Sequence, residues 1–167
     1  MADLYDWRGA TTRPAPPGEL GSSTPGDQGA EGAATGGIRI SDGNSVAWRR
    51  AEILSGSGYG NARSVAAVQS VLACGGEARG IRLLSPEGCE RAREEQYRGV
   101  DQILGRSVRY GLGYGIFDPA CGWAGWGGSI VMVDLDARMT VAYVMNQMLQ
   151  PDYRGLGIVL AAYDALG

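Results

Sequence analysis

A glycine-rich stretch with a period of two residues constrains the fold more than any other part of the sequence. In residues 107–116 (SVRYGLGYGI), apolar or aromatic side chains alternate with serine, arginine and glycine. Alternation of this kind is typical of a β-strand, and the nearly bare glycine face lets another segment pack close against it. We therefore predict a strand here, with a close contact on its glycine face.

Two apolar runs follow, at residues 130–133 and 140–145, with a short polar turn between them. Both runs are apolar at nearly every position rather than at every second one, which is typical of strands that are covered on both faces. We predict an antiparallel hairpin. Asp134 and Asp136 lie in its turn, where aspartate is common, and we interpret them as turn residues rather than as paired catalytic carboxylates.

Three helices are predicted around these strands. Asn61 or Ser64 can cap the first helix, which a pair of glycines ends. The second starts after Ser85 and runs to about Tyr97, and the last starts at Pro151. The resulting order is helix, helix, three antiparallel strands, helix. This is an α+β architecture, with an antiparallel sheet of about three strands flanked by helices.

The first part of the chain differs in composition from the rest. Residues 1–44 are rich in proline, glycine and small polar residues, and they offer little apolar surface to bury. We predict that residues 1–44 are a disordered or low-complexity segment and that residues 45–167 fold.

The chain contains neither lysine nor histidine, since all 15 of its basic residues are arginine. A Ser-His-Asp or Cys-His site cannot be built without histidine, and arginine stays charged and does not accept a proton. The net charge of −3 gives no field that would attract nucleic acid or an anionic membrane. We expect neither as a partner.

The cysteines indicate a reducing compartment. Cys74, Cys89 and Cys121 are an odd number and lack C-x-x-C spacing, which favours reduced thiols in a cytoplasmic protein. A metal site built from these cysteines alone would require a fourth ligand, and the chain has no histidine to supply it. We therefore expect no metal and no cofactor. The N-terminus carries charges without an apolar segment, and no apolar run approaches the length of a membrane span.

Residues 123–129 (WAGWGGS), followed by VMVDLD and TVAYVMNQM, resemble the C-terminal part of the serine β-lactamase-like hydrolases. The likeness is greatest to their esterase branch, which is related to class C β-lactamases and penicillin-binding proteins. It covers roughly Ala47 to the C-terminus. The resemblance implies a partial β-lactamase/transpeptidase-like fold, in which the C-terminal part of an α/β domain follows the end of a helical insert.

The resemblance also implies site residues. The third motif of the family is Lys-Thr-Gly, His-x-Gly or Trp-x-Gly at the start of an edge strand, and Trp123-Ala124-Gly125 fits the Trp form. By this likeness the backbone N–H of Trp126 contributes to an oxyanion hole, Gly125 lets the strand approach the substrate, and Trp123 shapes the acyl pocket. The alternative is a glycine-rich strand whose tryptophans pack on the core.

Tyr59-Gly60-Asn61 has the letters of the family's Tyr-x-Asn motif but lies too late in the chain for it. We interpret it as a tyrosine at a helix start with a capping asparagine. The alternative is that Tyr59 forms part of the wall of a substrate pocket.

Ser-x-x-Lys, the family's acylating motif, cannot occur in a chain without lysine. We therefore predict a C-terminal fragment that resembles a serine ester or amide hydrolase and is inactive alone. It would act on a small-molecule substrate only if another chain supplied the nucleophile. The alternative is a non-catalytic remnant or interaction module, which pairs with a copy of itself or with another chain through an open sheet edge.

Overall fold

The computed structural model describes residues 40–54, 56, 58–125, 127–149 and 153–167, which fall in two compact units, Met1–Gly58 and Tyr59–Gly167. In the first unit, the 3-10 helix η2 (Ile40–Asn44) precedes the short helix α2 (Val46–Arg50). Ser45 caps α2 by accepting a hydrogen bond from the backbone N–H of Trp48 at 3.0 Å. The predicted disordered segment lies outside the described residues apart from 40–44, which form η2.

The second unit contains three helices, and local signals explain where each begins. Asn61 caps α3, because its Oδ1 accepts a hydrogen bond from Ser64 N at 2.9 Å. Ser85 caps α4 in the same way, and α4 ends at Arg93, short of the predicted Tyr97, because the backbone of Glu94 leaves the helical conformation with a ψ of 123°. The predicted start of the last helix at Pro151 lies outside the described residues. The helices are α3 (Ala62–Ala73), α4 (Pro86–Arg93) and α5 (Arg154–Asp164).

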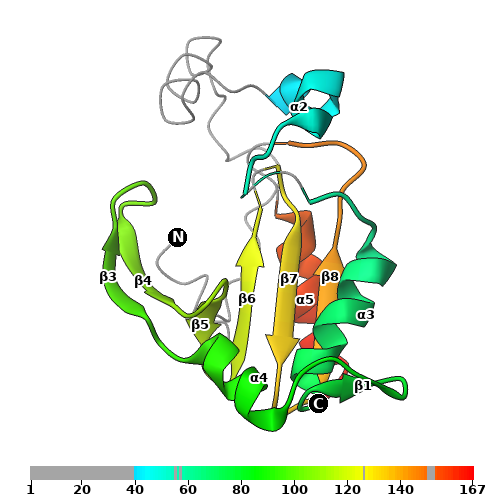
Figure 1. Cartoon of the computed structure of the whole chain (residues 1–167), viewed down its shortest axis with the longest axis vertical. Helices are drawn as coiled ribbons and strands as arrows, with labels where there is room; N and C mark the ends of the chain where they lie inside the picture. The colour runs from blue at the N-terminus through cyan, green and yellow to red at the C-terminus, as the bar shows by residue number, and fades with distance from the viewer. Residues whose placement is uncertain (1–39, 55, 57, 126, 150–152) are drawn as a thin grey trace. The chain divides into compact units, whose positions relative to one another are not determined.

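A six-stranded antiparallel sheet forms the centre of this unit, in the order β3-β4-β5-β6-β7-β8 (Figure 1). A separate two-stranded ribbon joins β1 (Glu77–Ala78) to β2 (Ile81–Arg82). The strands of the main sheet are β3 (Tyr97–Asp101), β4 (Arg106–Tyr110), β5 (Gly115–Phe117), β6 (Ala120–Ala124), β7 (Ile130–Asp134) and β8 (Met139–Tyr143). The antiparallel α+β class is confirmed, but the sheet is larger than the predicted three strands.

The glycine-rich stretch explains part of this difference, because it forms two strands rather than one. β4 ends at Tyr110, and Gly111 N donates a hydrogen bond to the carbonyl oxygen of Tyr114 at 2.8 Å, which closes a turn. Gly113 has a φ of +86° in that turn, a conformation that glycine adopts without strain. β5 then pairs antiparallel with β6. The period of two thus predicted strand structure correctly but missed the turn within it.

The predicted hairpin is β7–β8, paired from Ile130 with Tyr143 to Asp134 with Met139. β7 is buried at every position, and its alternate side chains enter different cores. Val131 and Val133 pack in a cluster with Leu72 of α3, whereas Ile130 and Met132 pack in another with Val159 of α5. α3 and α5 therefore cover opposite faces of the hairpin (Figure 1). Both strands are covered on two sides, as the apolar runs predicted.

Asp134 behaves as a turn residue, as predicted. Its Oδ1 accepts a hydrogen bond from Ala137 N at 2.8 Å, and its Oδ2 accepts one from the hydroxyl of Tyr163 on α5 at 2.7 Å. This carboxylate is buried, whereas Asp136 is exposed. No helix in the described ranges is both long and apolar enough to span a membrane.

Candidate functional site

The Trp123-Ala124-Gly125 motif lies where β6 ends. Trp123 and Ala124 are the last residues of β6 and pair with Val131 and Ile130 of β7. The expectation that the motif stands at the start of a strand is therefore wrong for this chain. The residues from Ala120 to Gly122 pair with β5 on one side and β7 on the other, whereas among the described residues Trp123 and Ala124 pair with β7 alone. The motif therefore lies at a locally unpaired edge, but at the end of its strand.

Gly125 opens a tight turn that carries the chain from β6 to β7. Its N–H donates a hydrogen bond to the carbonyl oxygen of Ser129 at 2.7 Å, and its carbonyl oxygen accepts one from Gly128 N at 3.1 Å. A Cβ atom at position 125 would collide with Ser129 Oγ, and Gly127 and Gly128 have φ values of +92° and +107°. The turn therefore favours glycine at positions 127 and 128, whereas a side chain at position 125 requires the Ser129 hydroxyl to rotate away.

Trp126 lies outside the described residues, so its backbone N–H as an oxyanion-hole donor stays a prediction. Before and after it in the sequence, Gly125 is hydrogen-bonded to Ser129 and Gly128 to Gly125. A short glycine turn at a strand end is a place where backbone N–H groups can point toward a ligand.

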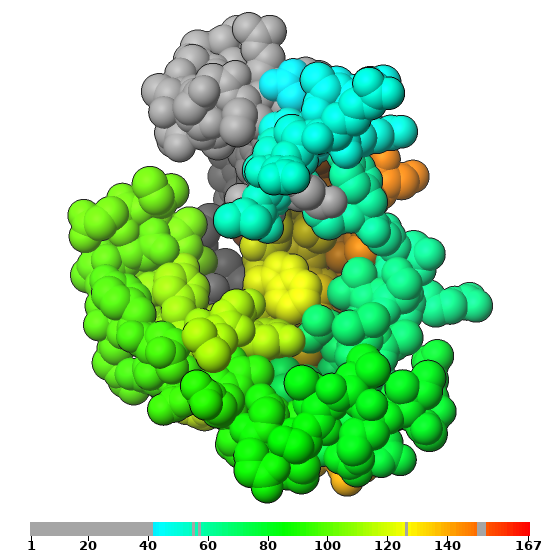
Figure 2. Space-filling model, in the orientation of Figure 1, coloured from blue at the N-terminus to red at the C-terminus, as the bar shows by residue number. Residues whose placement is uncertain are grey.

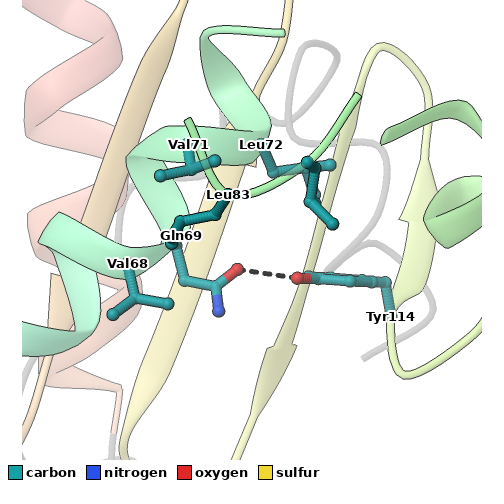
Figure 3. A pocket seen from close by; sticks show the side chains of 7 residues that line it. Val68, Gln69, Val71, Leu72, Leu83 and Tyr114 are labelled. Carbon is teal, nitrogen blue, oxygen red and sulfur yellow. Dashed lines mark hydrogen bonds between the residues drawn. The ribbon is translucent and has the colours of Figure 1, made fainter. Parts of the chain in front are cut away.

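Trp123 keeps a solvent-facing surface while it packs on an aromatic neighbour. It is 37% exposed, and its ring centroid lies 5.8 Å from that of Tyr114 with a 57° angle between the planes. The Tyr114 hydroxyl in turn donates a hydrogen bond to Gln69 Oε1 of α3 at 2.8 Å (Figure 3). Burial raises the pKa of Tyr114, which keeps its hydroxyl protonated as a donor. Trp123 is thus linked to α3 through one tyrosine.

An open hollow of about 220 Å³ lies beside this tyrosine (Figure 3). It is lined by four residues of α3 together with two leucines and the tyrosine: Val68, Gln69, Val71, Leu72, Leu83, Leu84 and Tyr114. In the space-filling view, the second unit is hollowed between α3 and the yellow β6 region (Figure 2). Neither Gln69 nor this hollow could be predicted from local sequence patterns, because Gln69 and Tyr114 lie 45 residues apart.

Tyr59 is 58% exposed and precedes the N-cap of α3. The interpretation of Asn61 as a cap is confirmed, since Ser64 Oγ also accepts a hydrogen bond from Asn61 N at 3.2 Å. Asn61 and Gln69 are eight residues apart, or about 12 Å along the helix axis. Tyr59 is therefore at the far end of α3 from the contact that joins α3 to Tyr114, whereas Trp123, Ala124 and Gly125 share one strand end.

A network of charged side chains braces the β3–β4 hairpin. Arg109 donates to Glu95 Oε2 at 2.6 Å and to Asp118 Oδ2 at 2.7 Å, and Arg98 donates two hydrogen bonds to the Glu95 carboxylate at 2.8 Å. Hydrogen bonds from Arg98, and then from Arg109, lower the pKa of Glu95 to about 2. The network joins the segment before β3 to β4 and to the connection between β5 and β6.

Cys89 and Cys121 are not activated nucleophiles. Burial raises the pKa of Cys89, and it raises that of Cys121 to about 11, so both side chains are thiols at neutral pH. All three cysteines are free. Within the part of the chain that the structure describes, no group of three or more His, Cys, Asp and Glu side chains is placed to hold a metal ion.

Comparison with known proteins gives one family match and one curated relative. The family model described as Beta-lactamase matches residues 3–165, so the match extends closer to the N-terminus than the likeness from Ala47 that the sequence motifs indicated. Esterase/beta-lactamase LipL of Mycobacterium tuberculosis (strain ATCC 25618 / H37Rv) is 36% identical over 109 residues, which cover 60% of this chain and 25% of LipL.

Two solved structures are similar over most of the described chain. A family VIII carboxylesterase has a TM-score of 0.71 and 33% identity, and the match covers 76% of this chain and 37% of the esterase. A penicillin-binding protein homologue from Caulobacter crescentus has a TM-score of 0.67 and 33% identity, over 73% of this chain and 36% of the homologue. The chain thus spans between a quarter and two fifths of the length of these relatives.

Proposed function

The chain belongs to the β-lactamase family, among relatives that include serine β-lactamase-like esterases, and from this we propose that it carries one side of an acyl-serine hydrolase site. The site is centred on the end of β6. Its substrate is a small-molecule ester or amide.

The observation that carries this proposal is the turn at the end of β6. Trp123 is packed on Tyr114 but keeps an exposed surface, and Gly125 starts a glycine turn in which a Cβ would collide with Ser129. In our proposal Trp123 and Ala124 contact the substrate, Gly125 permits its close approach, and the backbone N–H of Trp126 donates to the oxyanion. Tyr59 forms an outer part of the wall of the substrate pocket.

The chain supplies no acylating group. A serine hydroxyl needs a neighbouring base, and the family's base is the lysine of Ser-x-x-Lys, which a chain with 15 arginines and no lysine cannot provide. We propose that this chain is inactive alone and that its site is completed by another chain carrying the serine. In that complex, the serine oxygen bonds to the acyl carbon as the alcohol or amine departs, and water then releases the acid.

Complementation tests this proposal. The chain is coexpressed with a segment of a β-lactamase-family esterase that carries Ser-x-x-Lys, and hydrolysis of p-nitrophenyl butyrate is measured on the purified complex. We expect hydrolysis that depends on the added serine and falls at least about tenfold in Gly125→Val, because the side chain displaces the turn. Gly157→Ala, whose Cβ meets open space, is the matched control. A complex that forms but has equal rates in both variants would refute the assigned site.

A second candidate function is that of a non-catalytic interaction module, favoured by the edge of the sheet. Among the described residues β8 pairs with β7 alone, so its outer edge is available for a further strand. Thr140 in β8 also carries a buried Oγ1 without a hydrogen-bond partner in that part of the chain. A second copy, or the chain that supplies the nucleophile, would pair there through backbone hydrogen bonds.

A further inference from the structure

The hollow beside Tyr114 is apolar except at one point. Valines and leucines of α3 form one wall, and Leu83 and Leu84 form another. Its polar groups are the Gln69 amide and the Tyr114 hydroxyl, which are joined because the hydroxyl donates a hydrogen bond to Gln69 Oε1 at 2.8 Å (Figure 3). A hydrogen-bonded pair of this kind offers little to a charged ligand, whereas the surrounding side chains favour an aliphatic one.

The hollow also lies next to the candidate site. Tyr114 lines it and packs its ring on Trp123, so a single side chain separates the hollow from the end of β6. A group bound in the hollow would therefore contact Tyr114, which in turn contacts Trp123. The rest of the same molecule could extend over Trp123 toward the Gly125 turn.

The volume limits the size of the occupant. At about 220 Å³ the hollow is smaller than the roughly 300 to 1,000 Å³ of sites that take drug-sized ligands. It suits part of a molecule rather than a whole one. Val68 and Leu83 are 57% and 58% exposed, so the hollow is open at one side and can admit a chain from solvent.

We propose that this hollow is a subsite for a short aliphatic group of the ester substrate. The inference rests on the proposed function for the identity of the substrate, but binding of the aliphatic group requires only this chain. Each methylene that enters the hollow adds apolar contact with α3 and Leu83, until the space is filled.

Methyl NMR of the full chain, labelled at valine and leucine, tests this with a series of ethyl esters from ethyl acetate to ethyl octanoate. We expect saturable shifts at Val68, Leu72 and Leu83, with affinity rising about fourfold per added methylene and then reaching a plateau. Shifts that are spread over the whole chain, or an affinity that rises without a plateau, would overturn the proposal.

Two exposed positions provide matched variants. Val68→Asp places a charge in the hollow and weakens binding of ethyl butyrate roughly tenfold, whereas Ile81→Asp, at 59% exposure and outside the hollow, leaves it unchanged. Leu83→Ala enlarges the hollow and moves the plateau to longer esters, an effect that a general surface change would not produce. Equal binding by the chain with Val68→Asp and the chain with Ile81→Asp would overturn the subsite.

Ester binding in the hollow is measured on this chain alone, so its outcome is independent of hydrolysis by the complemented complex. Serine-dependent hydrolysis in the complemented complex, without ester binding in the hollow, would retain the proposed function and refute the subsite. Ester binding in the hollow without hydrolysis in the complex would retain the subsite and refute the proposed function.

Discussion

At Asp134, one buried carboxylate connects the hairpin turn to the last helix. Its Oδ2 accepts the Tyr163 hydroxyl at 2.7 Å, and its Oδ1 accepts Ala137 N. Tyr163→Phe removes a hydrogen bond to a charged group, so we expect the free energy of unfolding to fall by about 1.5 to 3 kcal/mol. Urea denaturation measures this change in the free energy of unfolding. Tyr153→Phe, at an exposed position, is the control, and equal losses in both variants would show that the contact contributes nothing specific.

The stability of the folded chain depends on pH through the Glu95 carboxyl group. Arg98 and Arg109 lower the pKa of this carboxyl from 4.5 to about 2 in the folded chain. Because the folded pKa is depressed, its contribution to stability is present above pH 4.5 and is lost as pH falls toward 2. Thermal melts between pH 6 and pH 2.5 measure the loss.

We expect Glu95→Gln to reduce this loss of stability between pH 6 and pH 2.5, because glutamine does not titrate. Glu94→Gln is the control, since within the described residues the Glu94 carboxylate takes part in no ion pair. If the melting temperature of the chain with Glu95→Gln fell with pH as steeply as that of the wild type, the network would not determine the acid sensitivity.

At the scale of elements, the packing of α5 on the hairpin depends on a glycine. A Cβ at Gly155 would lie 2.5 Å from Ile130 Cγ2 and 2.9 Å from Tyr143 Cδ1, whereas a Cβ at Gly157 meets open space. We expect Gly155→Ala to cost about 1 to 3 kcal/mol by overpacking. Gly157→Ala in the same helix should gain roughly 0.5 to 1 kcal/mol from helix propensity. Two stabilised variants would mean that α5 does not pack closely at Gly155.

Elements whose signals are local could be predicted from the sequence. Asn61 and Ser85 mark helix starts through contacts three residues away, and the two apolar runs specify the hairpin through burial of both faces. β3 could not be predicted in this way, because its side chains are mostly exposed and YRGVD shows no apolar alternation, although its partner β4 follows directly after residues 102–105. The same holds for the site: its motif could be read from the sequence, but the link from Trp123 through Tyr114 to Gln69 joins residues far apart in the chain.

For the whole molecule, the free edge of β8 predicts association. Among the described residues this strand has one partner, and an unpaired edge offers its backbone groups to another strand. We expect the chain to sediment as a dimer or larger species. Val144→Lys, next to the end of β8, should shift it toward monomer, whereas Val46→Lys in α2 should not. A compact, cooperatively melting wild-type monomer would contradict pairing through this edge.

The most direct measurement of the central claim is hydrolysis by the purified chain alone. Because the chain has the Trp-x-Gly turn but no lysine or histidine, we predict no hydrolysis of p-nitrophenyl butyrate or of a chromogenic cephalosporin above the buffer rate. Turnover that persists through purification and disappears when one serine of this chain is replaced would contradict it, because the chain would then contain its own acylating group.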